Sequence, residues 1–223
     1  MLTVERAKST HLRTIPDPSL IPVPAKQHIA VVGGGPAGLR AAEVAASLGA
    51  SVTVYEAMPS VGRKFLVAGK SGLNLTNGED WSSFLEKYHG GYGPRHDWHG
   101  ILTRFNHEAL RRWARELGIE TFVASSGKVF PTPVDGTIRA APLLRRWIEK
   151  LRSLDVRFKT RHRWTGFAED GALSFDHHGS QFAAKHDATI IALGGASWPG
   201  TGSDGGWVSV FRQLGIAVHP FSP

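Results

Sequence analysis

The stretch that decides the fold runs from residue 28 to residue 56. Residues 28–38 read His-Ile-Ala-Val-Val-Gly-Gly-Gly-Pro-Ala-Gly, and residues 51–56 read Ser-Val-Thr-Val-Tyr-Glu. The first segment is an apolar strand that enters a glycine-rich turn, and an alanine-rich helix follows it. The second segment is another apolar strand, which ends in an acid. This order predicts a βαβ unit of the kind that binds dinucleotides.

The turn contains three glycines with the spacing Gly33-x-Gly35-x-x-Gly38. We expect the first to allow a tight turn, the second to leave room for a pyrophosphate, and the third to let helix and strand pack closely. Pro36 and Ala37 open the helix, whose first N–H groups lack partners within the helix and whose dipole adds partial positive charge. The turn is therefore predicted to bind a pyrophosphate through backbone groups.

Glu56 ends the second strand at the distance from the glycines where a carboxylate accepts hydrogen bonds from ribose hydroxyls. Its negative charge repels a 2′-phosphate, so NADP is disfavoured in this site. Direct binding of NAD(H), as in a dehydrogenase, is an alternative reading of the same motif. The simplest alternative is an ordinary strand, turn and helix that bind no ligand.

The segment from residue 62 to residue 77 is rich in glycine and asparagine. We expect a loop without regular structure here, at the carboxyl edge of the sheet where open α/β sheets bind ligands. Its candidate contacts are two cations for the diphosphate and three polar residues for ribityl or ring atoms: Arg63, Lys64, Asn74, Thr76 and Asn77. The alternative is a glycine-punctuated turn that uses asparagine in left-handed conformations and binds nothing.

The rest of the chain predicts a mixture of helices and strands. In chain order we expect a helix over 107–117, short strands near 119–123 and 128–130, a helix over 140–154, a strand over 156–158, antiparallel strands near 164–168, 173–175 and 181–184, and an apolar strand over 188–193. Gly194 and Gly195 follow as a second glycine turn, which suits close approach to a cofactor. The fold class is therefore α/β, a Rossmann-like domain with a parallel sheet, a helical insertion and a small antiparallel β-meander.

Length and composition suit a folded protein, because 223 residues with 41% hydrophobic content can bury a substantial core. No apolar run reaches membrane-spanning length and the N-terminus lacks the apolar core of a secretory signal. We therefore expect no membrane association and a cytoplasmic location. Residues 1–27 contain four prolines and no periodicity, so we expect a flexible N-terminal extension.

Three further features limit the chemistry. The chain has no cysteine, so it is not a flavoenzyme that reduces disulfides through a cysteine pair. Iron–sulfur clusters and thiolate zinc sites are excluded for the same reason. The histidines near residues 89–99 and 177–178 lack the i, i+4 helical spacing of a catalytic zinc site, so we expect no metal. The net charge of +7 arises largely from polar faces of the two long predicted helices, and no nucleic-acid-binding motif accompanies it. We expect no specific nucleic-acid partner.

The order of the elements resembles the FAD domains of the glutathione-reductase type. In that family Gly33, Gly35, Gly38 and Glu56 match the pyrophosphate and ribose contacts. Residues 192–195 are similar to an Ala-Thr-Gly element that follows the meander, with leucine in place of the threonine. The resemblance implies FAD rather than NAD as the bound nucleotide.

A narrower resemblance, over roughly residues 28–223, is to the BaiN-type NAD(P)/FAD-dependent oxidoreductases of bacteria. It rests on Gly-Arg-Lys at 62–64, Asn-Leu-Thr-Asn at 74–77, Val-Phe-Pro at 129–131, Gly-Gly-Ala-Ser-Trp-Pro at 194–199 and Thr-Gly-Ser-Asp-Gly at 201–205. It implies FAD as cofactor and NAD(P)H as electron donor. Members of that family continue with a substrate domain and a C-terminal segment that closes over the flavin. Residues 28–223 are therefore interpreted as an FAD-binding domain that forms only the front portion of such a protein.

The leading hypothesis is a flavoprotein oxidoreductase with a small-molecule substrate, whose identity the sequence does not reveal. No side chain is assigned a catalytic role, because the flavin itself carries the chemistry in such enzymes. One alternative is an NAD(H)-binding, dehydrogenase-like domain. Another is a truncated, non-enzymatic remnant that binds nucleotide or pairs with a complementary chain, and a homo-oligomer is a further form of partnership.

Overall fold

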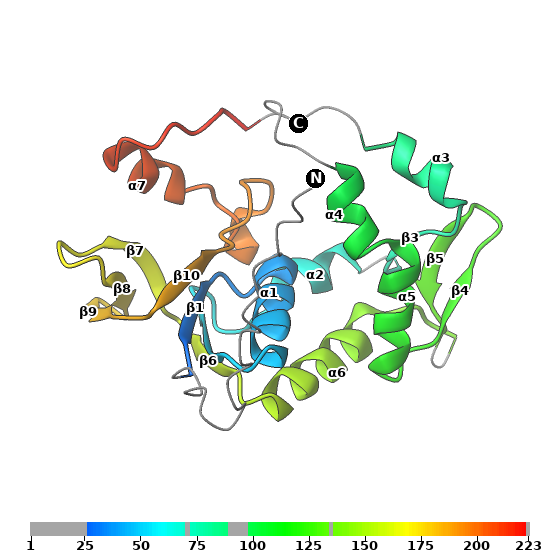
Figure 1. Ribbon diagram of the computed structural model, residues 1–223, viewed down its shortest axis with the longest axis horizontal. Coiled ribbons are helices and arrows are strands. Elements are labelled where there is room, and N and C mark those ends of the chain that lie inside the picture. The colour runs from blue at the N-terminus through cyan, green and yellow to red at the C-terminus, as the bar shows by residue number, and fades with distance from the viewer. Residues whose placement is uncertain (1–25, 70–71, 89–97, 134–135, 222–223) are drawn as a thin grey trace, which may run out of the picture.

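A four-stranded parallel sheet forms the centre of the molecule (Figure 1). The computed structural model describes residues 26–69, 72–88, 98–133 and 136–221, so the predicted extension lies almost entirely outside the described residues. The strand order is β10-β1-β2-β6, and each neighbouring pair is parallel. The strands are β1 (His28–Val32), β2 (Ser51–Glu56), β6 (Arg157–Thr160) and β10 (Ala188–Ile191). The predicted parallel sheet is confirmed.

Strand β1 is apolar because both of its faces are covered. Val31 packs in the cluster that contains helix α1 (Pro36–Ser47), whereas Ala30 and Val32 pack in the cluster of the antiparallel meander. Helix α1 turns Leu39 and Ala42 toward the first cluster, and both side chains are fully buried. A strand that is buried on both faces has a continuous apolar sequence. Residues 29–32 of β1 form such a run.

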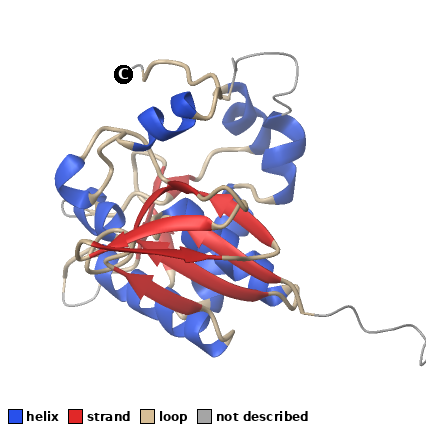
Figure 2. Cartoon of the chain, turned by 90° about the vertical axis from the view of Figure 1, so that its left-hand side faces the viewer, coloured by secondary structure: helices blue, strands red, loops and turns tan. Residues whose placement is uncertain are grey.

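The predicted meander is confirmed, with strands β7 (Arg163–Phe167), β8 (Leu173–His177) and β9 (Ser180–Ala184). It lies on the face of the parallel sheet away from α1, as the view from the meander side shows (Figure 2). The Tyr55 ring of β2 stacks on Phe175 of β8 with the ring centres 4.2 Å apart. The turn at residues 178–179 has positive φ at both positions, as expected for a tight hairpin.

The insertion between β2 and β6 contains helices and a second, three-stranded antiparallel sheet of order β3-β5-β4. Its helices are α2 (Arg63–Ala68), α3 (Trp81–Glu86), α4 (Trp98–Arg104), α5 (His107–Glu116) and α6 (Ala140–Ser153). Its strands are β3 (Thr76–Asn77), β4 (Thr121–Val123) and β5 (Lys128–Pro131). The predicted helices over 107–117 and 140–154 are thus confirmed, and the Asn106 side chain caps α5 by accepting a hydrogen bond from the Ala109 N–H.

The expectation of a loop without regular structure over residues 62–77 is wrong in two places. Gly62 adopts the left-handed conformation with φ of 70° and begins helix α2. Thr76 and Asn77 form strand β3 by pairing with Val129 and Lys128 of β5. Local sequence did not reveal this strand, because its partner lies about fifty residues further along the chain.

A buried carboxylate joins helix α1 to the insertion. Glu43 is 7% exposed and accepts hydrogen bonds from the indole N–H groups of Trp113 in α5 (3.1 Å) and Trp147 in α6 (2.9 Å). Arg40 forms an ion pair with the same carboxylate at 2.9 Å, and its guanidinium lies 4.4 Å from the centre of the Phe105 ring. This group of contacts holds helix α1 against α5 and α6.

Strand β10 occupies an edge of the sheet and is two residues shorter than the predicted apolar strand over 188–193. Its residues are exposed or half-buried although three of the four are apolar. The 3-10 helix η2 (Pro199–Thr201) and helix α7 (Trp207–Gln213) follow it. Among the described residues, the helices are too short or too polar to cross a membrane.

Candidate dinucleotide-binding site

A cleft of about 200 Å³ lies at the carboxyl ends of β1, β2 and β10. This is the edge where open α/β sheets bind their ligands. Eight of the predicted contact residues line the cleft: Gly33, Gly35, Pro36, Ala37, Glu56, Arg63, Lys64 and Gly194. The structure therefore brings together residues from the first glycine turn, the end of β2, helix α2 and the second glycine turn.

The three motif glycines differ in what a side chain at each position would contact. Gly33 has φ of 110°, and a Cβ there would lie 2.2 Å from the Ala192 carbonyl oxygen at the end of β10. A Cβ on Gly38 would lie 1.9 Å from the Gly33 carbonyl oxygen, so this glycine permits close packing of helix and turn. A Cβ on Gly35 would meet nothing within 4 Å. No described residue therefore explains the glycine at position 35 by packing, and Gly35 lines the cleft.

The N-terminus of helix α1 gives the cleft partial positive charge. Gly35 is the N-cap residue, Pro36 follows it, and the first hydrogen bond within the helix runs from the Leu39 N–H to the Gly35 carbonyl at 2.9 Å. The N–H groups of Ala37 and Gly38 precede that bond and lack acceptors within the helix. Because the helix dipole adds partial positive charge here, this end of α1 suits a diphosphate.

Glu56 is held against the glycine turn by two backbone hydrogen bonds. One carboxylate oxygen accepts from the Gly34 N–H at 2.8 Å, and the other accepts from the Met58 N–H at 2.8 Å. Each oxygen can accept a second hydrogen bond, because a carboxylate has about four lone-pair sites. The carboxylate is therefore oriented in advance at the cleft, where it can accept from two ribose hydroxyls.

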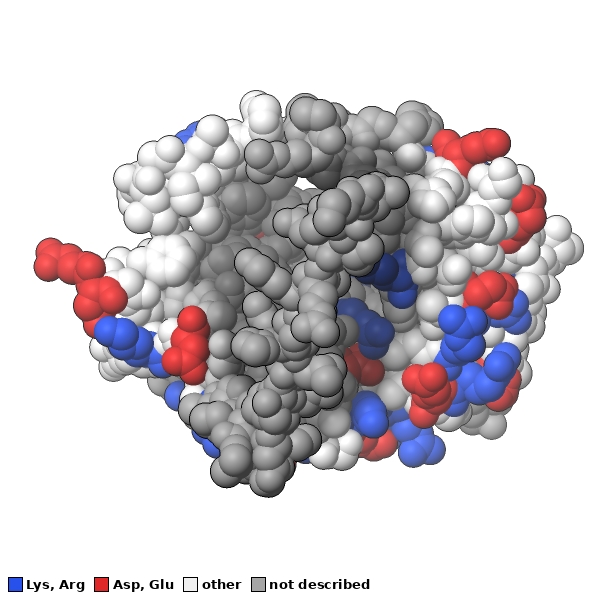
Figure 3. Space-filling view, in the orientation of Figure 1, with Lys and Arg blue, Asp and Glu red and all other residues white. Residues whose placement is uncertain are grey.

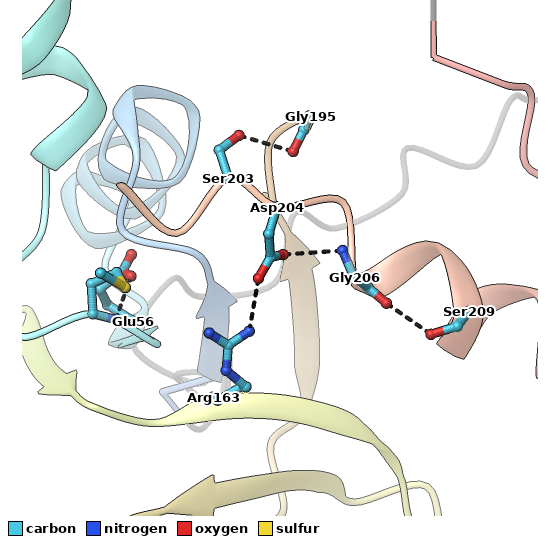
Figure 4. Close-up of polar contacts among 8 residues, drawn as sticks. Glu56, Arg163, Gly195, Ser203, Asp204, Gly206 and Ser209 are labelled. Carbon is cyan, nitrogen blue, oxygen red and sulfur yellow. Dashed lines mark hydrogen bonds and ion pairs between the residues drawn. The ribbon is translucent and has the colours of Figure 1, made fainter. Parts of the chain in front are cut away.

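The second glycine turn, after β10, lines the cleft through Gly194, and the Gly195 end of the turn contacts Ser203 (Figure 4). Gly194 has φ of 73°, and the Gly195 carbonyl accepts a hydrogen bond from the Ser203 hydroxyl at 2.9 Å. Lys64 crosses from α2 and donates to the Ser197 hydroxyl at 2.7 Å. These contacts join the insertion to the segment after β10 and place Lys64 at one rim of the cleft.

Asp204 secures the segment that follows this turn. Its carboxylate accepts from the Gly206 N–H at 3.0 Å and pairs with Arg163 of β7 at 3.2 Å (Figure 4). The Gly206 N–H and then Arg163 hold the pKa of Asp204 below its usual value. The carboxylate therefore stays ionised at neutral pH and fixes the start of α7.

Two buried donors in the cleft lack partners among the residues that the structure describes. They are Nε1 of Trp164, in β7, and Nε of Arg63, at the start of α2. Both residues line the cleft, and Trp164 is 7% exposed. Buried donors are usually satisfied in native proteins, and acceptor atoms of a ligand in the cleft would satisfy these two. A diphosphate and a ribosyl-adenine group carry such acceptors, and the residues present therefore fit a dinucleotide.

Five predicted contact residues lie outside the cleft lining. Gly38 packs beneath the turn, and Gly195 contributes only the carbonyl that binds Ser203. Asn74 lines a neighbouring apolar pocket instead of the cleft. Thr76 and Asn77 line neither cavity, because both belong to β3 in the insertion sheet, where the Asn77 amide contacts Glu79.

Three aromatic residues that line the cleft were not predicted from the sequence. His162 and Trp164 enter it from the start of β7, and Tyr55 enters it from β2. Burial raises the pKa of Tyr55 above its usual value, so its hydroxyl stays neutral at physiological pH. No motif marks His162 and Trp164, although their place at the start of the predicted meander was a usable signal. Thr201, Gly202 and Ser203 also line the cleft, and they lie in the quoted motif at 201–205.

The sequence predicts that two groups of histidines, near residues 89–99 and 177–178, bind no metal. His89, His96 and Asp97 lie outside the described residues. Among the residues that are described, no group of three or more His, Asp and Glu side chains has the arrangement of a metal site. His177 contacts the rings of His162 and His178 instead.

A protein-family model described as the HI0933-like protein Rossmann domain matches residues 27–222. The chain belongs to this family. A curated relative, ribosomal RNA dihydrouridine synthase from Haemophilus influenzae, is 27% identical over 192 residues. The match covers 85% of this chain and 46% of the relative, so the chain spans about half of that protein's length.

Solved structures similar to this HI0933-like chain share its fold at low sequence identity. The flavocytochrome c3 fumarate reductase in its open conformation has a TM-score of 0.57 at 16% identity, covering 86% of this chain and 41% of that one. The 3-ketosteroid-Δ4-(5α)-dehydrogenase of Rhodococcus jostii RHA1 has a TM-score of 0.56 at 18% identity, covering 78% and 47%. THI4 of Thermovibrio ammonificans has a TM-score of 0.53 at 17% identity, covering 86% and 64%.

Proposed function

We propose that this chain is the FAD-binding part of a flavoprotein oxidoreductase of the BaiN type, with NAD(P)H as its electron donor. The observation that carries the proposal is the open space beside Gly35, at the N-terminus of α1 and next to the oriented Glu56 carboxylate. The Trp164 and Arg63 donors, which have no partner among the described residues, support it, because acceptor atoms of a bound ligand would satisfy them. The family match and the shared fold of the solved neighbours support the FAD-binding part of this proposal.

In the proposed complex each group has a separate role. The N–H groups of Ala37 and Gly38 hold the diphosphate, and Arg63 adds positive charge beside it. Glu56 accepts hydrogen bonds from the adenosine ribose, and its charge disfavours a 2′-phosphate there. The bound FAD supplies hydride transfer, and the protein supplies binding, orientation and exclusion of water.

Thermal unfolding with added nucleotides tests this proposal. FAD at one hundred times its dissociation constant stabilises a protein by about 2.7 kcal/mol. For a domain of this size we expect the Tm to rise by roughly 5–10 °C. NADH at the same concentration is expected to leave the Tm within about 1 °C of the free protein. A larger shift with NADH than with FAD would favour the dehydrogenase-like alternative, and no shift with either would refute nucleotide binding.

A small-molecule substrate remains our proposal from the sequence, and the curated relative introduces a second candidate. That relative is named as a ribosomal RNA dihydrouridine synthase, which favours a uracil base in ribosomal RNA as the group reduced. The net charge of +7 is compatible with an RNA partner. On the side of α5 and α6, however, Lys and Arg are interspersed with Asp and Glu (Figure 3), and Arg111 and Arg146 pair with Glu108 and Glu149.

Deletion of the gene in its own host distinguishes the two candidates. If the protein reduces uracil in ribosomal RNA, mass spectrometry of the purified RNA is expected to show loss of one dihydrouridine, and expression of the wild-type gene restores it. An unchanged dihydrouridine content in the deletion strain would leave the small-molecule reductase as the better proposal.

A further inference from the structure

Basic residues alternate with uncharged residues along β6 and just beyond it. Residues 157–161 read Arg-Phe-Lys-Thr-Arg, and the three cations are exposed whereas the two residues between them are half-buried. Successive side chains of a strand point to opposite faces, so Arg157 and Lys159 lie on the same face of β6. Arg161 follows directly after the strand. We call Arg157, Lys159 and Arg161 the basic stripe.

The basic stripe lies at an edge of the parallel sheet. Among the described strands β6 pairs only with β2, and the residues opposite Arg157 and Lys159 are Thr53 and Tyr55, which carry no carboxylate. The Lys159 ammonium lies 5.6 Å from the centre of the Tyr55 ring, a contact that uses none of its hydrogen-bond donors. No residue of the stripe forms an ion pair with another described residue. Their charges are therefore available to an anionic partner.

Two further cations extend the stripe beyond the amino end of β6. Lys26 and Arg152 line a cavity of about 390 Å³ together with Arg157 and a single acid, Asp155. Neither Lys26 nor Arg152 forms an ion pair with a described residue. Arg152 lies in the last turn of α6, where the helix dipole attracts a cation, but the dipole does not account for Lys26 or Arg157. The cavity therefore keeps a net positive charge.

Protection of the sheet edge explains only part of this pattern. Charged side chains on an edge strand prevent it from pairing with another sheet, and Arg157 and Lys159 have that effect. Lys26, Arg152 and Arg161 lie outside the strand, so this reason does not apply to them. The five cations together form a track that runs from the amino end of the sheet to its carboxyl end.

Building on the ribosomal RNA candidate of the proposed function, we propose that the basic stripe, with Lys26 and Arg152, binds the phosphate backbone of single-stranded RNA. Lysine and arginine that neutralise backbone phosphates gain affinity by releasing counterions, and such contacts position a strand without reading its sequence. Single-stranded RNA is favoured because a base must leave its stack to reach an enzyme's reactive group. The track ends beside the cofactor cleft, since His162, which lines the cleft, directly follows Arg161.

Fluorescence anisotropy with a fluorescein-labelled oligouridine tests this proposal. The stripe variant combines Arg152→Gln, Arg157→Gln and Lys159→Gln, and we expect it to bind the RNA about tenfold more weakly or worse at low salt. A plot of log affinity against log salt concentration is expected to become less steep by about 2, because each lost contact with a single strand removes about 0.7. The FAD affinity is expected to stay within about twofold of wild type, since none of the three residues lines the cleft.

The matched control removes the same charge from the helical insertion. It combines Arg104→Gln, Arg112→Gln and Lys128→Gln, on α4, α5 and β5. All three side chains are exposed, and none forms an ion pair with a described residue. This variant is expected to bind oligouridine within about twofold of wild type.

The remaining outcomes separate this proposal from the proposed function. Unchanged RNA affinity in the stripe variant, or an equal loss in the control, overturns the assignment of the stripe. Binding of wild type to phosphatidylserine vesicles but not to oligouridine also overturns it and assigns the stripe to a lipid surface. If wild type binds FAD but not oligouridine, the RNA track fails and FAD binding stands. If it binds oligouridine through the stripe but not FAD, the proposed flavoprotein function fails and the RNA track stands.

Discussion

Replacing Gly35 with tryptophan is expected to reduce the affinity for FAD on the order of 100-fold or more. A Cβ added at this position meets no atom of the described residues within 4 Å, and Gly35 lines the cleft, so a larger side chain is expected to project into the space assigned to the diphosphate. The backbone of Gly35 has φ of −78° and ψ of 179°, an extended conformation that any residue adopts. The substitution should therefore block the ligand without unfolding the protein. Isothermal titration with FAD measures the loss, and circular dichroism confirms the fold.

Gly200→Trp is the matched control for this experiment. A Cβ added at Gly200 also meets nothing within 4 Å among the described residues, and Gly200 does not line the cleft. Its FAD affinity is expected to stay close to that of wild type. Normal FAD binding by Gly35→Trp would show that the cofactor does not approach this turn.

Replacing Glu43 with alanine is expected to lower the free energy of unfolding by about 3–5 kcal/mol. The change leaves the buried N–H groups of Trp113 and Trp147 without an acceptor and removes the ion-pair partner of Arg40. It also detaches α1 from the two helices that orient it. Urea unfolding followed by tryptophan fluorescence measures the effect.

An exposed ion pair provides the comparison for Glu43. Glu108 is 51% exposed and pairs with Arg111 at 3.4 Å on the surface of α5. Glu108→Ala is expected to cost less than about 1 kcal/mol, because exposed ion pairs contribute little. If Glu43→Ala were as mild as Glu108→Ala, the buried carboxylate would not be what joins α1 to the insertion.

The parts of the fold that depend on local sequence were predictable. The β1–α1–β2 unit followed from the glycine spacing and the apolar runs within residues 28–56. The hairpin turns of the meander depend on Asp170-Gly171 and His178-Gly179, and both glycines have the positive φ that such turns use. In both cases the residues that determine the structure are close together in the chain.

The parts that depend on distant partners were not predictable. Strand β3 forms by pairing with β5. This pairing places Thr76 and Asn77, which were expected to contact the ligand, in the insertion sheet. The cleft residues His162 and Trp164 come from a meander more than one hundred residues after the glycine turn. Glu43 was read as part of a helix, and its buried role became visible only when Trp113 and Trp147 were placed around it.

A crystal structure of the protein bound to FAD tests the central claim most directly. The account predicts that the diphosphate lies within hydrogen-bonding distance of the Ala37 and Gly38 N–H groups, with the ribose hydroxyls on Glu56. Phosphates bound at any other place, with Glu56 free of the ribose, would contradict it.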